Sequence, residues 1–139
     1  MKQIPPCIAQ KSDVDSCRLL GQTRKGMLII VSGPSGTGKG TLCERLLAWD
    51  PNIVFSISAT TRAPRDNEKE GVHYSFITEE EFDQLLQTGN LLEHATVHDH
   101  RYGTPRPPVE AALEKGLDVL LDVDSQGAMS VMKQMPHCV

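Results

Sequence analysis

Aromatic residues, clustered basic residues and long apolar runs are all scarce in this sequence. Phe, Trp and Tyr make up 4% of the 139 residues while 39% are hydrophobic, a composition typical of one ordinary globular domain. The net charge is -4 and the basic residues are dispersed, which argues against a protein that coats nucleic acid. No apolar run is long enough to cross a membrane, and residues 1–26 lack the apolar core of a secretory signal.

Cysteine and histidine are present, but not at the spacing of a metal site. The cysteines are isolated from one another, which favours free thiols in a reducing, cytoplasmic setting. The histidines share no helical face and have no cysteine or carboxylate partner at ligand spacing. We therefore expect no metal centre among Cys7, Cys17, Cys43, Cys138, His73, His94, His98, His100 and His137.

The first 26 residues contain Pro5, Pro6 and scattered charges but no sustained periodicity. We predict that residues 1–26 form a disordered leader, with a functional arm as the alternative. A single domain is then expected over residues 27–139, and no internal repeat or low-complexity tract divides it.

The most informative stretch begins with an apolar run over residues 27–32, which predicts a buried strand. A glycine-rich segment with Lys39 follows, and the apolar spacing from Thr41 onward predicts a helix. A strand, a glycine loop, a lysine and a helix in this order form a phosphate-binding loop, in which backbone N–H groups and the helix start surround an anion. The alternative is a glycine-rich turn without a ligand. The predicted nucleotide-binding residues are Gly33, Pro34, Ser35, Gly36, Thr37, Gly38, Lys39, Gly40 and Thr41.

Gly40 occupies the position after the lysine where this motif usually has a hydroxyl group for Mg²⁺. Phosphate binding survives this change because the backbone provides it, and the metal is expected near Thr41 or through water. A second apolar run ends in Asp122, which is placed to face the Mg²⁺ of a nucleotide. A strand-end acid that caps the next helix is the alternative, and Asp124 fits either role.

The rest of the sequence alternates between short apolar strands and amphipathic helices. Thr78 and Glu81 form a capping-box pattern, and Met129, Met132 and Met135 are predicted to face the core. The order predicts an α/β fold in which a parallel sheet is flanked by helices and interrupted by a β-rich insert at about residues 58–104. Strands are expected at residues 53–57, 72–77, 90–98 and 118–124, helices at 79–88, 109–115 and 125–135, and a turn and return at 101–104.

Arg62 and Arg65 lie three residues apart on either side of Pro64, in a segment that should be extended. Two guanidinium groups in this arrangement can close on one phosphate. Two solvated surface arginines are the alternative, and the residues alone do not decide between them. A second phosphate site beside a nucleotide loop is what a kinase with a phosphorylated acceptor requires.

Six segments in this order resemble guanylate kinase, a P-loop nucleoside monophosphate kinase: residues 33–39, 56–65, 71–76, 92–95, 102–104 and 121–127. The resemblance covers residues 27–139. It implies transfer of a phosphoryl group from ATP to GMP with Mg²⁺ as cofactor. ATP would bind the phosphate loop, and the implied catalytic residues are Lys39, Arg62 and Asp122.

The resemblance also implies a GMP site. Its phosphate would be held by Arg62, Arg65, Tyr74 and Tyr102, and its guanine read by Ser58, Glu93, Thr104 and Asp124. A carboxylate can accept from N1–H and N2–H of guanine together, and a hydroxyl can donate to O6. AMP would leave Glu93 unpaired, and such sites can discriminate by roughly 10⁴-fold. Without the resemblance, the tyrosines would be read as half-buried strand aromatics and Glu93 as a rim acid.

The resemblance ends before the family's arginine-bearing lid, so we expect a C-terminally truncated chain in which Cys138 and Val139 begin a further strand. Such a chain should bind GMP weakly, transfer phosphate poorly, and leave the strand at residues 28–31 as an exposed apolar edge. A non-catalytic module that binds phosphopeptides is the main alternative to the enzyme. A kinase for another nucleotide is disfavoured by Glu93 and Thr104. Neither a nucleic-acid nor a membrane partner is expected, and the oligomeric state is left open.

Overall fold

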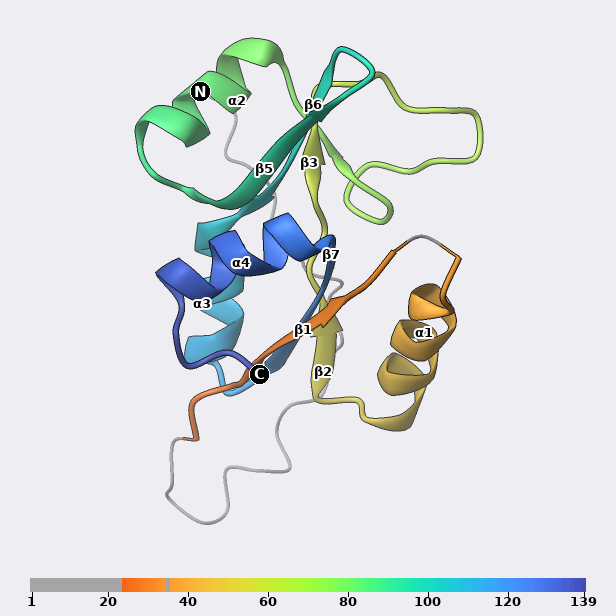
Figure 1. Ribbon diagram of the computed structural model, residues 1–139, viewed down its shortest axis with the longest axis vertical. Helices are drawn as coiled ribbons and strands as arrows, with labels where there is room; N and C mark the ends of the chain where they lie inside the picture. Colours follow the sequence, from red (N-terminus) through yellow and green to blue (C-terminus); the bar gives the residue numbers. More distant parts are fainter. Residues whose placement is uncertain (1–23, 35) are drawn as a thin grey trace.

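A parallel three-stranded sheet forms the centre of the computed structural model, which describes residues 24–34 and 36–139 (Figure 1). The strand order is β1-β7-β2, with bounds Leu28–Ser32, Asp118–Val123 and Ile53–Phe55. The middle strand, β7, is paired on both edges and covered on both faces, which is why its apolar run is buried almost throughout.

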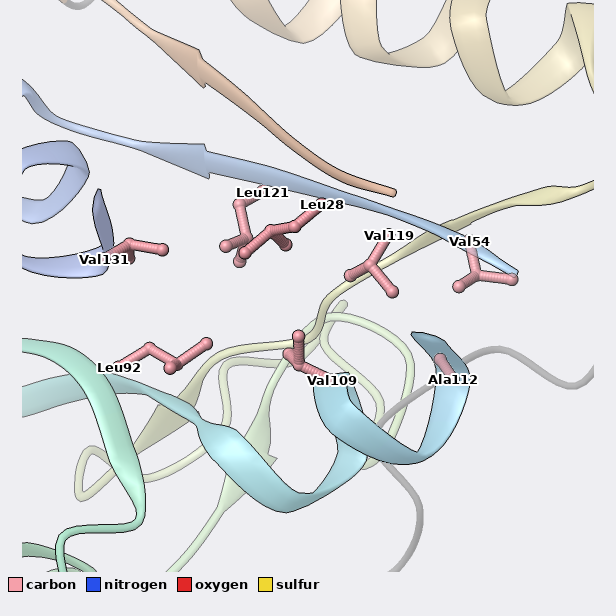
Figure 2. Packing of buried hydrophobic residues seen from close by; sticks show 8 residues of the cluster. All are labelled: Leu28, Val54, Leu92, Val109, Ala112, Val119, Leu121 and Val131. Atoms are coloured by element: carbon pink, nitrogen blue, oxygen red, sulfur yellow. The ribbon is translucent and has the colours of Figure 1, made fainter. Parts of the chain in front are cut away.

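Helices cover both faces of this sheet (Figure 1). Helix α1 (Lys39–Trp49) packs on one face, where Cys43 joins Ile53 and Leu120 in a small cluster. Helices α3 (Arg106–Glu114) and α4 (Ser125–Gln134) pack on the other. There the larger cluster contains Leu28, Val54, Leu92, Val109, Ala112, Val119, Leu121 and Val131 (Figure 2). Because successive side chains of a strand point to opposite faces of the sheet, the strands contribute residues to the clusters on both faces.

A second sheet of four strands lies beyond the carboxyl end of the first, with the order β4-β3-β6-β5. Its bounds are Ser75–Phe76, Ala59–Thr60, His100–Pro105 and Leu91–Val97. Helix α2 (Glu79–Gln87) packs on it through Phe82 and Leu85. Leu92 of β5 belongs to the larger cluster of the main sheet, so the two sheets share a core.

The capping box at the start of α2 is confirmed. Thr78 Oγ1 accepts from the Glu81 N–H at 3.1 Å, and a Glu81 carboxylate oxygen accepts from the Thr78 N–H at 2.8 Å. Gly89, with a φ of 68°, follows the end of the helix. The acidic residues of this first turn therefore have a structural task.

The strand predicted at residues 72–77 is wrong over its first half, because only Ser75–Phe76 pairs as β4. The preceding residues form a turn in which the Val72 and His73 N–H groups donate to Lys69 O, and two side-chain hydrogen bonds support it. The Lys69 N–H donates to His73 Nδ1 at 3.0 Å, and the Phe76 N–H donates to a Glu70 carboxylate oxygen at 2.8 Å. Side-chain bonds of this kind are hard to foresee from an alternating pattern.

The turn predicted at residues 101–104 lies earlier in the chain. Those residues belong to β6, and the turn falls at His98 and Asp99, which have φ values of 49° and 64°. Helix α3 also begins before the predicted Val109, because Pro107 and Pro108 are accommodated in its first turn, where a proline forfeits no helical hydrogen bond.

The prediction that the methionines of α4 face the core is wrong for two of the three. Met129 is 58% exposed and Met132 is 52% exposed, and only Met135 packs against the main cluster. The helix instead buries Gly127, Ala128 and Val131. Small residues bring α4 close to its neighbours and leave the long side chains outside.

Strand β1 forms one edge of the parallel sheet. Val139 lies against this edge: its N–H donates to Leu28 O at 2.9 Å, and the Ile30 N–H donates to Val139 O at 2.8 Å. A residue bonded to two residues of a neighbouring strand in this way makes the pattern of a parallel pair.

Residues 1–23 of the predicted leader lie outside the described residues. Its last residues contact the domain: Arg24 pairs with Asp118 at 2.9 Å, and the Gly26 N–H donates to Leu113 O at 2.8 Å. Among the described residues, no helix combines the length and apolarity needed to span a membrane.

Candidate active site

The predicted phosphate loop connects β1 to α1 at the carboxyl edge of the parallel sheet (Figure 1). Gly36 and Gly38 have φ values of 81° and 88°, a region that glycine adopts without strain. Gly38 is the N-cap of α1, and the first turn of the helix contains no acidic residue. No side chain of the helix or its cap therefore competes with an anion for the first N–H groups.

The loop is closed by a hydrogen bond from Thr37 Oγ1 to Pro34 O at 2.7 Å. Lys39 passes close to Gly33: a Cβ at residue 33 would be in ordinary van der Waals contact with Lys39 Cδ, at 3.6 Å. Gly40 and Thr41 are exposed in the first turn of α1, and Ser35 lies outside the described residues.

Lys39 and Asp122 face each other across the sheet edge. Lys39 Nζ lies 3.1 Å from Asp122 Oδ1, and the two side chains are 20% and 29% exposed. Asp122 is the fifth residue of β7 and pairs with Val31 of β1, so its position is fixed by the sheet. A phosphate group in the loop would compete with Asp122 for the ammonium group.

The oxygen groups near the loop suit Mg²⁺ but form no complete metal cage. Thr41 offers a hydroxyl and Asp122 a carboxylate, and Mg²⁺ is usually held by few protein oxygens together with water and phosphate. Within residues 24–34 and 36–139, no group of three or more His, Cys, Asp or Glu residues could hold a metal by itself.

Arg62 lies at the centre of the predicted acceptor clamp, which is the set of residues expected to hold the GMP phosphate: Arg62, Arg65, Tyr74 and Tyr102. Its Nε–H donates to the Tyr102 hydroxyl at 3.2 Å, and its guanidinium carbon lies 5.4 Å from the centre of the Tyr74 ring. The two tyrosine rings meet edge to face, with centroids 6.0 Å apart. Three of the four residues assigned to the GMP phosphate therefore form one cluster.

The guanidinium fork of Arg62 is directed at Glu68, a residue that the sequence reading overlooked. Its Nη1 and Nη2 donate to the two Glu68 oxygens at 2.8 and 2.9 Å. The pKa of Glu68 falls to about 2, chiefly because of the Arg62 hydrogen bonds and then because of the Arg65 N–H. The only sequence signal was its place three residues after Arg65, inside a charged loop.

The fourth residue, Arg65, is exposed, but it is not remote from Arg62. Its N–H donates to Glu68 Oε1 at 2.9 Å, and its positive charge helps to keep the pKa of Glu68 low. Arg62 thus contacts the Glu68 carboxylate through its guanidinium group, and Arg65 contacts it through its backbone N–H.

Glu93 and Thr104 pair across β5 and β6, and the Thr104 hydroxyl donates to Glu93 Oε1 at 2.7 Å. Thr104 is fully buried, whereas Glu93 is partly exposed. Burial raises the pKa of Glu93, and the charge of Asp124 raises it further, while the Thr104 hydrogen bond and His94 lower it. Glu93 is therefore the perturbed carboxylate of this cluster.

Asp124 is the N-cap of α4, where its Oδ1 accepts from the Gly127 N–H at 2.7 Å. The absence of a side chain at Gly127 leaves room for two carboxylates: a Cβ there would lie 3.1 Å from Asp124 Oδ1 and 3.3 Å from Glu93 Oε2. Gly127, like Glu68, was not among the site residues predicted from the sequence. Ser58 lies in the link from β2 to β3, half-buried, and its carbonyl accepts from the Ser75 N–H at 2.9 Å.

Three connections that carry candidate site residues leave the same edge of the parallel sheet: the predicted phosphate loop after β1, the arginine segment after β2, and Asp124 after β7. Open α/β sheets bind ligands at this edge. A sequence profile of the guanylate kinase family matches residues 25–139. The chain belongs to the guanylate kinase family.

Individual guanylate kinases agree with this membership. The chain is 54% identical to guanylate kinase of a Jannaschia species over 78% of its length, and 47% identical to that of Clostridioides difficile over 84%. A crystal structure of guanylate kinase from Anaplasma phagocytophilum superposes with a TM-score of 0.67 at 42% identity, covering 84% of this chain and 59% of that one. The first two alignments cover 50% and 57% of those guanylate kinases, so the chain spans about half the length of the curated relatives it matches.

Proposed function

We propose that the protein transfers a phosphoryl group from ATP to GMP, and that this chain carries the phosphate loop for ATP and the site for GMP. The observation that supports it most is the end of β7. Asp122 pairs there with Lys39 of the phosphate loop, and the charge of Asp124, two residues further on, acts on Glu93 of the second sheet. One strand thus brings two binding regions to one edge, as a transfer between two bound substrates requires.

At the donor site, the loop backbone and the start of α1 would cradle the ATP phosphates. Lys39 would exchange Asp122 for the outer phosphate oxygens. Mg²⁺, held near Thr41 and Asp122 through water, would neutralise charge on those phosphates.

At the acceptor site, Arg65, Tyr74, Tyr102 and the outer edge of Arg62 would hold the GMP phosphate. An oxygen of this phosphate attacks the γ-phosphorus of ATP, and the bond from that phosphorus to the β–γ bridging oxygen breaks to release ADP. The acceptor oxygen is already largely ionised at pH 7, because the second pKa of such a phosphate is about 6. The site therefore needs to position and stabilise charge more than to remove a proton.

Guanine recognition would rest on Glu93, which can accept from N1–H and N2–H together. Because the hydrogen of Thr104 is already directed at Glu93, we assign Thr104 to orienting that carboxylate and Ser58 to O6. Asp124 would complete the edge of the site beside Glu93. Residues 58–104 then form the acceptor-binding insert of the domain, and the isolated cysteines fit a reducing cytoplasm.

The test is calorimetric titration of the chain with GMP, AMP and a phosphoserine peptide. We expect GMP to bind at least about 100-fold more tightly than AMP, since AMP leaves Glu93 unpaired. Equal binding of GMP and AMP would overturn the assignment of the acceptor. Tighter binding of the phosphopeptide than of GMP would favour a peptide-binding module that uses the same clamp.

A further inference from the structure

Arg62 has few hydrogen-bond donors left for a ligand. A guanidinium group has five N–H donors. Those of Arg62 are directed at the Tyr102 hydroxyl, the Ala63 carbonyl and the two oxygens of Glu68, so that one N–H, on Nη2, has no partner among residues 24–34 and 36–139. The pair of Nη1 and Nη2 N–H groups that could bind a phosphate bidentately is therefore already bonded to Glu68.

Glu68 is anchored independently of Arg62. Its N–H donates to Arg65 O at 2.9 Å, and its Oε1 accepts from the Arg65 N–H at 2.9 Å, so the turn from residue 65 to 68 holds the carboxylate in place. A carboxylate that moved aside for a phosphate would lose the Arg65 bond as well as the Arg62 pair. This favours a fixed Glu68 over one that a ligand displaces.

The pair is also sheltered from solvent. The side chains of Arg62 and Glu68 are 12% and 16% exposed, and the guanidinium carbon lies over the Tyr74 ring, 5.4 Å from its centre. Exposed ion pairs hold long side chains only loosely, whereas a two-point carboxylate bond combined with a ring contact fixes the plane of an arginine.

We propose, on the basis of the function proposed above, that Glu68 is a positioning residue of the acceptor clamp: it fixes the Arg62 guanidinium between the Tyr74 ring and the Tyr102 hydroxyl without itself touching the acceptor. Arg62 then presents its remaining Nη2–H to the phosphate. The Tyr102 oxygen accepts from Arg62, which leaves the Tyr102 hydrogen for a phosphate oxygen. Arg65, whose guanidinium group is exposed, supplies the uncompensated positive charge.

The direction in which GMP affinity changes when Glu68 is replaced separates a positioning role from competition with the phosphate. If Glu68 positions Arg62, replacing the carboxylate weakens GMP binding. If Glu68 only occupies the place of the phosphate, removing its charge frees Arg62 and strengthens GMP binding.

The experiment is a double-mutant cycle on GMP affinity, measured by NMR titration of the full chain at fixed salt. Glu68→Gln keeps an acceptor for the Arg65 N–H but loses the charge and the second strong acceptor, and we expect about tenfold weaker GMP binding. Arg62→Lys keeps the charge at residue 62 but cannot form the fork. In the Arg62→Lys background, Glu68→Gln should change the affinity by less than about twofold.

Glu70→Gln is the matched control for a purely structural effect. Glu70 lies in the same loop, where its carboxylate accepts from the Phe76 N–H and the Ser75 hydroxyl and has no bond to Arg62. We expect Glu70→Gln to lower the melting temperature at least as much as Glu68→Gln while leaving GMP affinity nearly unchanged. If Glu68→Gln does not fold, Glu68→Asp, which keeps the charge but shortens the reach to Arg62, should weaken GMP binding in its place.

Unchanged or tighter GMP binding by Glu68→Gln, or an equal loss in both backgrounds, would overturn the proposal. Failure of the unmodified chain to prefer GMP over AMP would instead overturn the proposed function, so the two failures are distinguishable.

Discussion

The two proposed binding regions of this chain are built in opposite ways. The predicted phosphate loop is made of backbone, with left-handed glycines, a helix start without a side-chain cap and one cation, Lys39. The acceptor region is made of side chains that hold one another: Arg62 on Glu68, Tyr74 and Tyr102, and Thr104 on Glu93. Backbone can surround any polyphosphate, whereas selectivity for one base requires polar side chains fixed in advance.

The largest expected effect would separate the two regions. Lys39→Met removes the cation of the phosphate loop, and we expect ATP affinity to fall about 10–100-fold, the worth of one or two charge-assisted hydrogen bonds. GMP affinity should change by less than about twofold. Fluorescence titration with an ATP analogue and calorimetry with GMP measure the two values. An equal loss of both affinities would mean that the sites are not distinct.

Thr104→Val tests how strongly the acceptor region depends on its inner hydrogen bonds. The change removes a hydrogen bond to a carboxylate at a fully buried position, and we expect about tenfold weaker GMP binding.

The pH dependence of GMP affinity in Thr104→Val should shift in a definite direction. The pKa of Glu93 is raised by burial and by Asp124 and lowered by Thr104 and His94. Glu93 must be ionised to accept from guanine, so GMP affinity falls as pH drops through the raised pKa. Without the Thr104 bond that pKa rises further, and the loss should begin at higher pH. Thr60→Val, which removes another buried hydroxyl that donates to Arg101 O and accepts from the Arg62 N–H, should leave this midpoint in place because neither bond involves Glu93. A midpoint that moves in both variants would contradict the role of Thr104.

Gly127→Ala tests whether the Glu93 and Asp124 carboxylates need the open space beside residue 127. The new Cβ would lie 3.1 Å from Asp124 Oδ1 and 3.3 Å from Glu93 Oε2. We expect about fivefold weaker GMP binding, equivalent to the ~1 kcal/mol at the low end for overpacking, with ATP affinity unchanged. Ser125→Ala, at an exposed position on the same helix, is the control. An unaffected GMP affinity in Gly127→Ala would show that Glu93 does not depend on this space.

The smallest effect is expected at Met129, which is 58% exposed on α4. Met129→Ser should change the free energy of unfolding by no more than about 0.5 kcal/mol, as for other exposed positions. Urea denaturation measures this value. A loss of more than about 2 kcal/mol, typical of a buried methionine, would restore the original prediction that Met129 lies in the core.

The backbone-built region was the easier one to predict. Glycine spacing, Lys39 and the apolar strands predict the loop between β1 and α1 and the parallel sheet, because each feature is local in the sequence. The capping box at Thr78 could be predicted in the same way, from residues close together in the sequence. Met129 and Met132 were misplaced because helical spacing shows that residues share a face, but not which face meets the core.

The side-chain-built region could be predicted only in outline. Glu68 and Gly127 were overlooked because their importance arises from contacts across a folded turn or between two sheets, and neither residue stands out by type. The residues alone left open whether Ser58 or Thr104 donates to O6 of the base, and the bond from the Thr104 hydroxyl to Glu93 favours Ser58. Such assignments require the register of β5 against β6.

The most direct test of two neighbouring sites in one cleft is the affinity of a bisubstrate ligand, in which adenosine and guanosine are joined through their 5′ oxygens by a chain of phosphates. If the phosphate loop and the Arg62 clamp open toward each other, this ligand should bind at least about 100-fold more tightly than either ATP or GMP alone, because its second half binds at a high effective concentration. A dissociation constant no lower than that of the better single nucleotide would show that the two sites do not face one another.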